Sequence, residues 1–143
     1  MNLKRVAAVM SLAGAIAAAT AGTSHAQVAM AGGCELRITE VRALDLQETP
    51  TDEIYLRVGD ERTGTRTFTE GQTREAAELG NPDQITEFIA PGGFVAVSVV
   101  EDDPTIDTVI GSFRAPCRAA SVERDVAGAG AFYRVSYVVT QLP

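Results

Sequence analysis

The chain has 143 residues, of which 45% are hydrophobic and 22% are charged, as expected of a globular domain and not of a disordered chain. Without Lys4 and Arg5 the basic residues fall from 12 to 10 against 19 acids, so residues 27–143 carry a net charge of −9. This balance excludes the basic surface that nucleic-acid binding requires. Residues 27–143 also contain no lysine, histidine or tryptophan, which removes most nucleophile-plus-base chemistry, and we expect no enzyme.

Residues 1–26 have the pattern of an export signal. A basic start precedes an apolar stretch over residues 6–21, and small residues stand at positions 24 and 26, where signal peptidase reads them. We predict cleavage after Ala26, which leaves residues 27–143 as one secreted domain. A membrane anchor is the alternative, but the apolar stretch is shorter than the roughly 20 residues that span a bilayer. We expect no transmembrane segment in the mature chain.

Two cysteines follow the signal, and a pair outside the cytoplasm usually forms a disulfide. Cys34 precedes the first expected strand and Cys117 follows a late one, so a bridge would close nearly the whole domain into one loop. The alternative is a reactive thiol pair, which would need a nearby lysine or histidine to lower a thiol pKa. We therefore predict a disulfide between Cys34 and Cys117.

Segments that alternate between apolar and polar residues predict strands, and so does the continuous β-branched run at residues 94–100. In chain order they are residues 36–44, 54–58, 94–100, 109–115 and 132–140, with weaker candidates at 65–69 and 85–89. A change of phase near Glu40 predicts a β-bulge. Residues 73–79 predict one or two helical turns, which Gly80, Asn81 and Pro82 end. Short strands separated by turn residues favour an all-β fold, an antiparallel β-sandwich of seven or eight strands.

Two acidic loops separate the strongest of these strands. The candidate metal ligands are Asp45 and Asp52 from the first loop and Glu101, Asp103 and Asp107 from the second. If both loops lie at one end of the sandwich, their carboxylates meet without a lysine, histidine or nearby arginine and would require a cation. Calcium fits, because it takes six to eight oxygen ligands in loose geometry, whereas zinc prefers histidine and cysteine. The alternative is that these acids form a solvated surface.

The segments around both loops resemble the C2 domain family. In residues 52–58 an acid precedes an alternating strand. In residues 97–111 an apolar strand ends in two acids one residue apart, Glu101 and Asp103, and Asp107 and Ile110-Gly111 follow. The resemblance implies an eight-stranded β-sandwich whose loops at one end bind calcium and phospholipid. On that pattern the ligand positions fall on Asp45, Asp52, Glu101, Asp103 and Asp107.

These patterns lead to two functional hypotheses. The first is a secreted, monomeric, calcium-binding C2-like module that binds a protein, glycan or lipid partner through its acidic loops. The alternative is a metal-independent, disulfide-bonded, immunoglobulin-like interaction or inhibitor module. Arginine as the only basic residue after position 26, together with abundant alanine and glycine, suggests a bacterial source.

Overall fold

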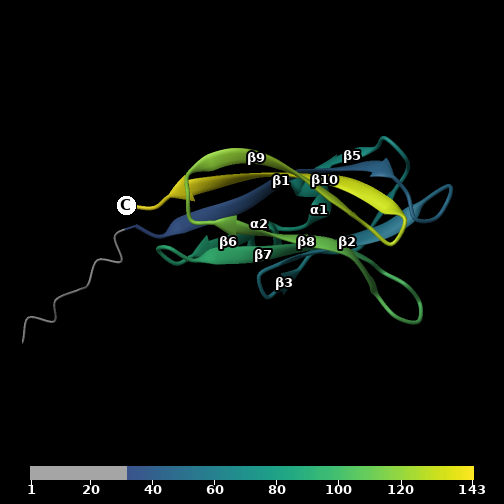
Figure 1. Cartoon of the computed structure of the whole chain (residues 1–143), viewed down its shortest axis with the longest axis horizontal. Coiled ribbons are helices and arrows are strands. Elements are labelled where there is room, and N and C mark those ends of the chain that lie inside the picture. The colour runs from purple at the N-terminus through teal and green to yellow at the C-terminus, as the bar shows by residue number, and fades with distance from the viewer. Residues whose placement is uncertain (1–31) are drawn as a thin grey trace, which may run out of the picture.

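The protein is built from two antiparallel β-sheets that pack face to face (Figure 1). The computed structural model describes residues 32–143, and the predicted signal peptide and its cleavage site lie outside them. No helix in this part of the chain is long and apolar enough to cross a membrane. The predicted all-β sandwich is confirmed.

The first sheet contains five strands: β1 (Cys34–Asp45), β5 (Thr73–Glu75), β6 (Thr86–Ile89), β9 (Ala120–Gly128) and β10 (Ala131–Gln141). Their order is β5-β1-β10-β9, and β6 also pairs with β1. Because β5 and β6 pair with different parts of β1, on the edge that β10 leaves free, they share one strand position. The register between β1 and β10 shifts between Ile38 and Glu40, so the predicted bulge is confirmed.

The second sheet contains β2 (Asp52–Val58), β3 (Glu61–Arg62), β4 (Arg66–Phe68), β7 (Phe94–Glu101) and β8 (Thr108–Pro116). Their order is β3-β2-β7-β8, and β4 also pairs with β2. Since β3 and β4 share one edge of β2, this sheet also has four strand positions. The two sheets together have eight positions, within the predicted range of seven or eight strands.

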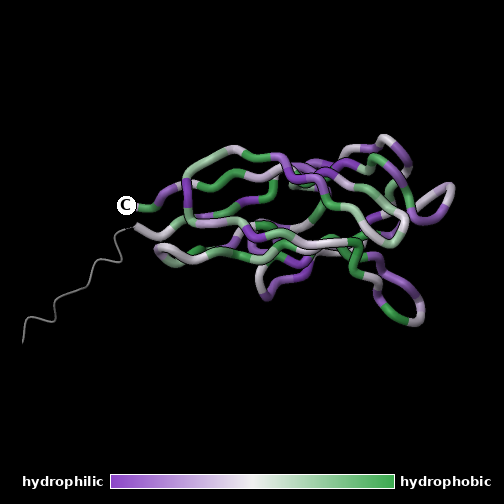
Figure 2. The backbone as a smooth tube through the Cα atoms, viewed as in Figure 1, coloured by the Kyte–Doolittle hydropathy of each residue, from purple (hydrophilic) through white to green (hydrophobic). Residues whose placement is uncertain are grey.

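Alternation along the strands builds the core between the sheets. The inward residues of β10 are Tyr133, Val135, Tyr137 and Val139, all buried, as their spacing predicted. The facing wall consists of Ile54, Leu56 and Val58 from β2 and of Val95, Val97 and Val99 from β7. Figure 2 shows hydrophobic residues along these strands and hydrophilic residues in most of the loops. Burial of these apolar side chains is the main source of stability.

Strand β9 was not predicted from the sequence. Only Val126 of its residues is fully buried, and Glu123, Arg124 and Asp125 occupy its middle. The strand lies at the edge of its sheet, where charged residues are common because they discourage pairing with another chain. A hydrophobic pattern therefore gives little signal for it.

The segment expected to be helical is only partly helical. Thr73–Glu75 forms β5, and α1 (Ala76–Leu79) is a single turn that ends at Gly80. Asn81 then caps a second single turn, α2 (Pro82–Ile85), by accepting a hydrogen bond from the Gln84 amide at 3.2 Å. The segment Gly80-Asn81-Pro82 therefore ends the first helical turn and also begins the second.

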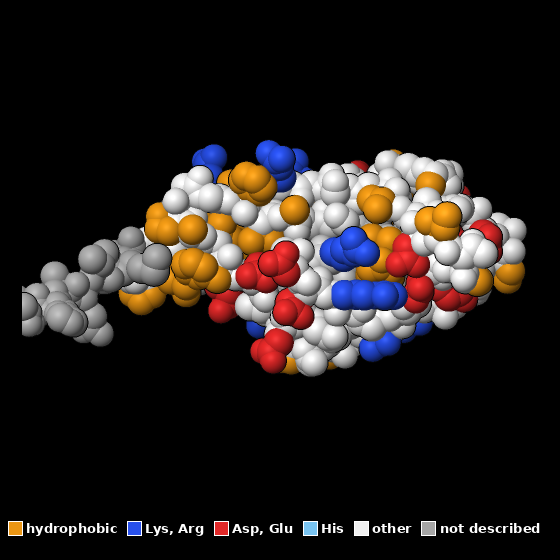
Figure 3. All heavy atoms as spheres, turned by 90° about the horizontal axis from the view of Figure 1, so that it is seen from below, with side chains coloured by type: hydrophobic (Ala, Val, Ile, Leu, Met, Phe, Trp, Pro, Cys, Tyr) orange, Lys and Arg blue, Asp and Glu red, His pale blue; other side chains and the backbone are white. Residues whose placement is uncertain are grey.

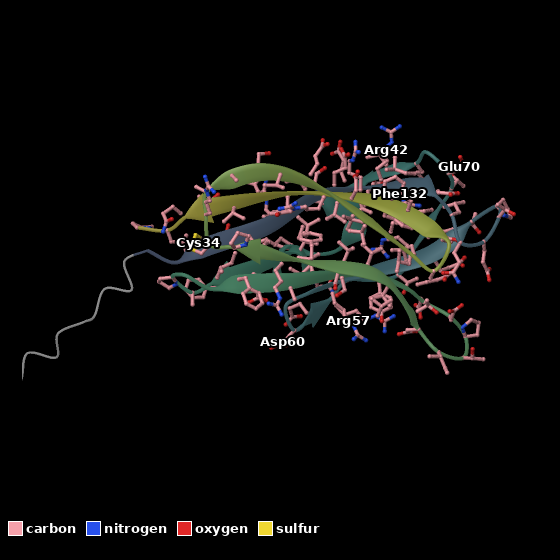
Figure 4. All side chains as sticks on the ribbon, viewed as in Figure 1. Cys34, Arg42, Arg57, Asp60, Glu70 and Phe132 are labelled. Atoms are coloured by element: carbon pink, nitrogen blue, oxygen red, sulfur yellow. A yellow bond between two sulfur atoms is a disulfide. The ribbon has the colours of Figure 1, made fainter. Side chains whose placement is uncertain are left out.

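The antiparallel connections place the loops at two ends of the sandwich. Residues 46–51, 69–72 and 102–107 lie at one end, here called the acidic end. Cys34 lies at the opposite end, here called the disulfide end, and Figure 4 labels it there with Glu70 of the 69–72 loop at the acidic end.

The predicted disulfide joins the two sheets. Cys34 begins β1 and Cys117 follows β8, and their Cα atoms are 5.3 Å apart across a sequence separation of 83 residues. A loop of this length restricts the unfolded chain enough to stabilise the fold by roughly 4 to 5 kcal/mol in the chain-entropy model.

Replacing Cys34 and Cys117 together with alanine should lower the free energy of unfolding by a few kcal/mol, because the unfolded chain gains conformational freedom. Urea unfolding of the variant and of the oxidised protein measures the loss. Reduction of the wild-type protein should reproduce this loss, and the variant should not respond to reductant. A variant as stable as the oxidised protein would contradict this account.

Candidate functional site

The two acidic loops lie side by side, as the sequence predicted. β2 and β7 are antiparallel neighbours in which Ile54 pairs with Glu101, so the loop before β2 and the loop after β7 emerge together. The Asp102 amide donates to the Glu53 carbonyl at 2.8 Å, which joins the loop after β7 to the start of β2. Figure 3 shows acidic side chains gathered at this end, with basic side chains beside them.

Three carboxylates converge between these loops. Glu48 comes from the loop after β1, Glu101 ends β7, and Asp103 follows it, and one oxygen of each lies within 4.8 Å of the others. We call these residues the carboxylate cluster. Glu101 and Asp103 had been predicted as ligands, whereas Glu48 had not, because strand alternation gives no rule for which residues of an irregular loop point inward.

Glu101 occupies an inward position at the end of β7, in phase with the core residues Val97 and Val99. Its side chain is 3% exposed, and its Oε2 atom has no hydrogen-bond partner within residues 32–143. Burial, followed by the nearby carboxylates of Asp103, Asp52, Glu48 and Glu53, raises the pKa of Glu101 to about 7. A buried carboxylate without a partner is costly, so the site favours a proton or a cation at this position.

Asp52 organises the loop that carries Glu48. It is fully buried, and its Oδ2 accepts hydrogen bonds from the Gln47 amide at 2.9 Å and the Tyr133 hydroxyl at 2.8 Å. Its Oδ1 accepts from the Glu48 amide at 2.7 Å. Of the predicted ligands, Asp52 is therefore the one whose two oxygens already bond to the protein, and it fixes the backbone of Glu48 beside Glu101.

Tyr133 supplies the bond that crosses from the first sheet to Asp52. Burial, and then the hydrogen bond to Asp52, raise the pKa of the Tyr133 hydroxyl, so it remains a protonated donor at neutral pH. Its ring packs edge-on against Phe68 with ring centroids 5.7 Å apart. The donor is thus held in place by packing as well as by its hydrogen bond.

The remaining predicted ligands, Asp45 and Asp107, lie at the acidic end but outside the carboxylate cluster. Asp45 is exposed and accepts a hydrogen bond from the Leu46 amide at 3.0 Å. Asp107 is exposed and accepts one from the Tyr55 hydroxyl at 2.7 Å. Burial, and then this hydrogen bond, raise the pKa of Tyr55.

The expectation that no arginine offsets the charge of the loops is wrong for one residue. Arg62 of β3 donates to Asp102 at 3.1 Å, and the Thr65 hydroxyl also donates to this carboxylate. The Arg62 guanidinium lies over the Tyr55 ring, 3.7 Å from its centroid. Asp102 is not part of the carboxylate cluster, whose three members form no ion pair within residues 32–143.

The donor set of the cluster suits a hard cation. It offers carboxylate oxygens alone, with no histidine or cysteine, which matches calcium and does not match zinc. The unpartnered Oε2 atom of Glu101 is an oxygen that a bound ion would satisfy. The residues of the acidic end therefore fit calcium.

Comparison with known proteins identifies the fold. No protein-family model matches the sequence. No curated protein matches it at a significant level either. A structure of two C2 domains of extended-synaptotagmin 2 superposes with a TM-score of 0.52 at 15% identity, covering 95% of this chain and 48% of that one. The fold is that of a C2 domain.

Two further structures match this C2-like chain. One, described by the words "CC2D1B coordinates ESRCT-III activity during the mitotic reformation of the nuclear envelope", has a TM-score of 0.51 at 11% identity and covers 76% of this chain and 54% of that one. The other, a "Structure of a C2 domain", has a TM-score of 0.49 at 15% identity and covers 76% of this chain and 98% of that one. This chain thus spans about half the length of the two longer structures. At such low identities the similarity shows the fold alone.

Replacing Tyr133 with phenylalanine should lower the free energy of unfolding by about 1–3 kcal/mol, because the charged and buried Asp52 loses one of its three donors. Urea unfolding measures the change. Tyr137→Phe is the matched control, since Tyr137 is equally buried but stacks on Phe113 instead of bonding to a carboxylate. Equal losses in the two variants would contradict the assigned role of the hydroxyl.

Glu101 should make the protein less stable as the pH rises through the range between its two pKa values. The pKa of Glu101 has its ordinary value of 4.5 in the unfolded chain and is about 7 in the folded protein. Between these two values the unfolded chain has lost the proton that the native state keeps. The contribution of Glu101 to the free energy of unfolding is therefore largest at the acidic side of this range, and it is lost as the pH rises to about 7. Glu101→Gln should remove this slope and be more stable than the wild type at pH 8 by about 3 kcal/mol.

Urea unfolding at several pH values between about 5 and 8, in chelator, measures the slope. Glu61→Gln, which changes an exposed acid of β3, should keep the wild-type profile. Parallel profiles for the wild type and Glu101→Gln would show that Glu101 ionises as freely in the fold as in the unfolded chain.

Proposed function

We propose that this chain is a secreted C2-like binding module whose acidic end takes up calcium and then recruits a protein, glycan or lipid partner. The observation that carries the proposal is Glu101, a buried carboxylate with an unpartnered oxygen, held against Glu48 and Asp103. A cation would supply the missing partner and offset the repulsion among the three acids.

Glu48, Glu101 and Asp103 would hold the ion, with backbone carbonyls and water completing six to eight ligands. Asp52 would act by positioning Glu48 and by adding negative charge, since its oxygens accept three hydrogen bonds. Magnesium should bind poorly, because it demands tighter octahedral geometry than two loops impose. Extracellular modules bind calcium with dissociation constants of roughly 0.1 to 1 mM, which suits a secreted protein.

The partner would dock beside the ion. Ile106 is 79% exposed in the same loop as Asp103, and it is the most exposed large hydrophobic side chain of residues 32–143. Calcium would reduce the negative charge around this side chain, which would make contact with a partner dependent on the ion. We propose a non-catalytic role, because this site contains carboxylates without a partner nucleophile or histidine.

Two observations support the secreted setting. The Cys34–Cys117 disulfide is typical of proteins that fold in an oxidising compartment. The sequence of residues 1–26 has the pattern of an export signal.

Calcium should raise the melting temperature. At about 100 times the dissociation constant a ligand stabilises the folded state by roughly 2.7 kcal/mol, which corresponds to roughly 8 to 20 °C for a domain of this size. Melting curves in excess chelator and in a saturating excess of calcium over the millimolar dissociation constant measure the shift. Asp103→Asn and Glu101→Gln should lose most of it, because each removes a carboxylate of the cluster.

Asp83→Asn, which changes an exposed acid of α2, should keep the full shift. Glu101→Gln should be stable in chelator and yet insensitive to calcium, which separates loss of the site from loss of the fold. Ile106→Ser should keep the calcium shift, since Ile106 is assigned to partner contact. Identical melting of the wild type in chelator and in calcium would reject the site and favour the metal-independent interaction module.

A further inference from the structure

A second feature lies on the side of the sandwich near the disulfide end, away from the carboxylate cluster. A groove of about 300 Å³ opens between the end of β8 and the start of β9. Its apolar surface comes from Val122 on β9 and from Tyr137 and Val139 on β10, and Pro116 ends the opposite wall. In Figure 1 the short connection between β8 and β9 joins the lower sheet to the upper one.

Small residues explain why the edge strands meet at one end and separate at the other. A Cβ atom at Gly128 would lie 2.1 Å from the Ile110 carbonyl oxygen, so β9 contacts β8 directly near the acidic end. Near the disulfide end, residues 117–119 cross from one sheet to the other, and Ala120 brings only a methyl group. The side of the sandwich therefore stays open where a larger side chain at the start of β9 would fill it.

Two arginines line this opening. Arg124 alternates in phase with Val122 and Val126, so it occupies a position on the face of β9 that is directed toward the other sheet. Arg118 lies in the connection before β9. The acids beside Arg124 belong to the opposite face of β9, where Glu123 and Asp125 pair with Arg134.

Neither Arg118 nor Arg124 forms an ion pair within residues 32–143. No acid lines the groove, although residues 27–143 carry 19 acids against 10 arginines. An apolar surface lined by two arginines that form no ion pair complements an anion attached to an apolar body.

We propose that this groove binds a small amphiphilic carboxylate, with its apolar chain on Val122 and Tyr137 and its carboxylate between Arg118 and Arg124. The volume lies at the low end for small-molecule sites, which favours a short chain over a macromolecule. Guanidinium groups match a carboxylate because their paired N–H donors meet both of its oxygens. This site is independent of the calcium site, because no residue is shared between them.

Octanoate is the probe, titrated into the isotopically labelled protein in chelator and followed by NMR. We expect saturable shifts at the groove, with a dissociation constant on the order of 1 mM or below. Octanol has the same chain without the charge, and acetate has the charge without the chain. Each should bind at least about tenfold more weakly than octanoate, because each lacks one half of the recognition.

Arg124→Gln and Arg118→Gln should each weaken octanoate binding by about tenfold, and Ala120→Leu should block it by filling the groove. Arg114→Gln is the matched control, since Arg114 lies over the Phe94 ring outside the groove. All four variants change exposed residues and should melt as the wild type does. Equal binding of octanol and octanoate, unchanged affinity in both arginine variants, or shifts confined to the acidic end would overturn the proposal.

Discussion

The acidic end depends on one buried carboxylate, that of Asp52. It starts β2 in one sheet and accepts a hydrogen bond from Tyr133 in the other, so it joins the two sheets where no covalent bond does so. Its bonds to the Gln47 and Glu48 amides also set the path of the loop between β1 and β2. Because the Cys34–Cys117 bridge joins the sheets at the opposite end, both ends of the sandwich are fixed, one by a disulfide and the other by charge-assisted hydrogen bonds.

The two buried carboxylates of the acidic end have opposite environments. Asp52 accepts hydrogen bonds from three donors. Glu101 is buried near four other acids, and its Oε2 atom has no hydrogen-bond partner within residues 32–143. If stability alone mattered, both carboxylates would have hydrogen-bond or ion-pair partners, or an apolar residue would replace Glu101, whose inward position continues a row of valines. Retaining an unsatisfied carboxylate there is understandable if an ion satisfies it, and this is the physical basis of the proposed calcium site.

How much of this structure the sequence could predict depends on where each residue lies. Strand β10 shows clear alternation, β7 is a continuous run rich in β-branched residues, and two cysteines leave only one pairing, so these features were predictable. The edge strand β9 was not, because most of its side chains face solvent and carry no hydrophobic pattern.

Arg62 and Glu48 were missed for a different reason. Arg62 reaches Asp102 across 40 positions of sequence, a distance that no local pattern reports. Glu48 lies in an irregular loop whose path depends on the buried Asp52, and that burial requires both sheets to be in place. Contacts made only after the sheets assemble therefore limited the prediction of the site more than that of the fold.

Asp52, Glu101 and Arg124, the charged residues on which the two proposals depend, all occupy inward positions of their strands. Asp52 precedes Ile54 and Leu56 in the inward phase of β2, and Glu101 follows Val97 and Val99 in the inward phase of β7. Arg124 lies between two inward valines of β9 in the same way. In the middle of a central strand such a residue would put a charge into the core, whereas at a strand end or on an edge strand the same phase directs it to the rim of the core. At the strand ends Asp52 and Glu101 are shielded from water, which strengthens their electrostatic interactions, whereas Arg124 on the edge strand stays exposed. The inward phase at the border of a sheet is therefore the shared structural basis of the two proposals, the calcium site at the acidic end and the ligand groove beside β9.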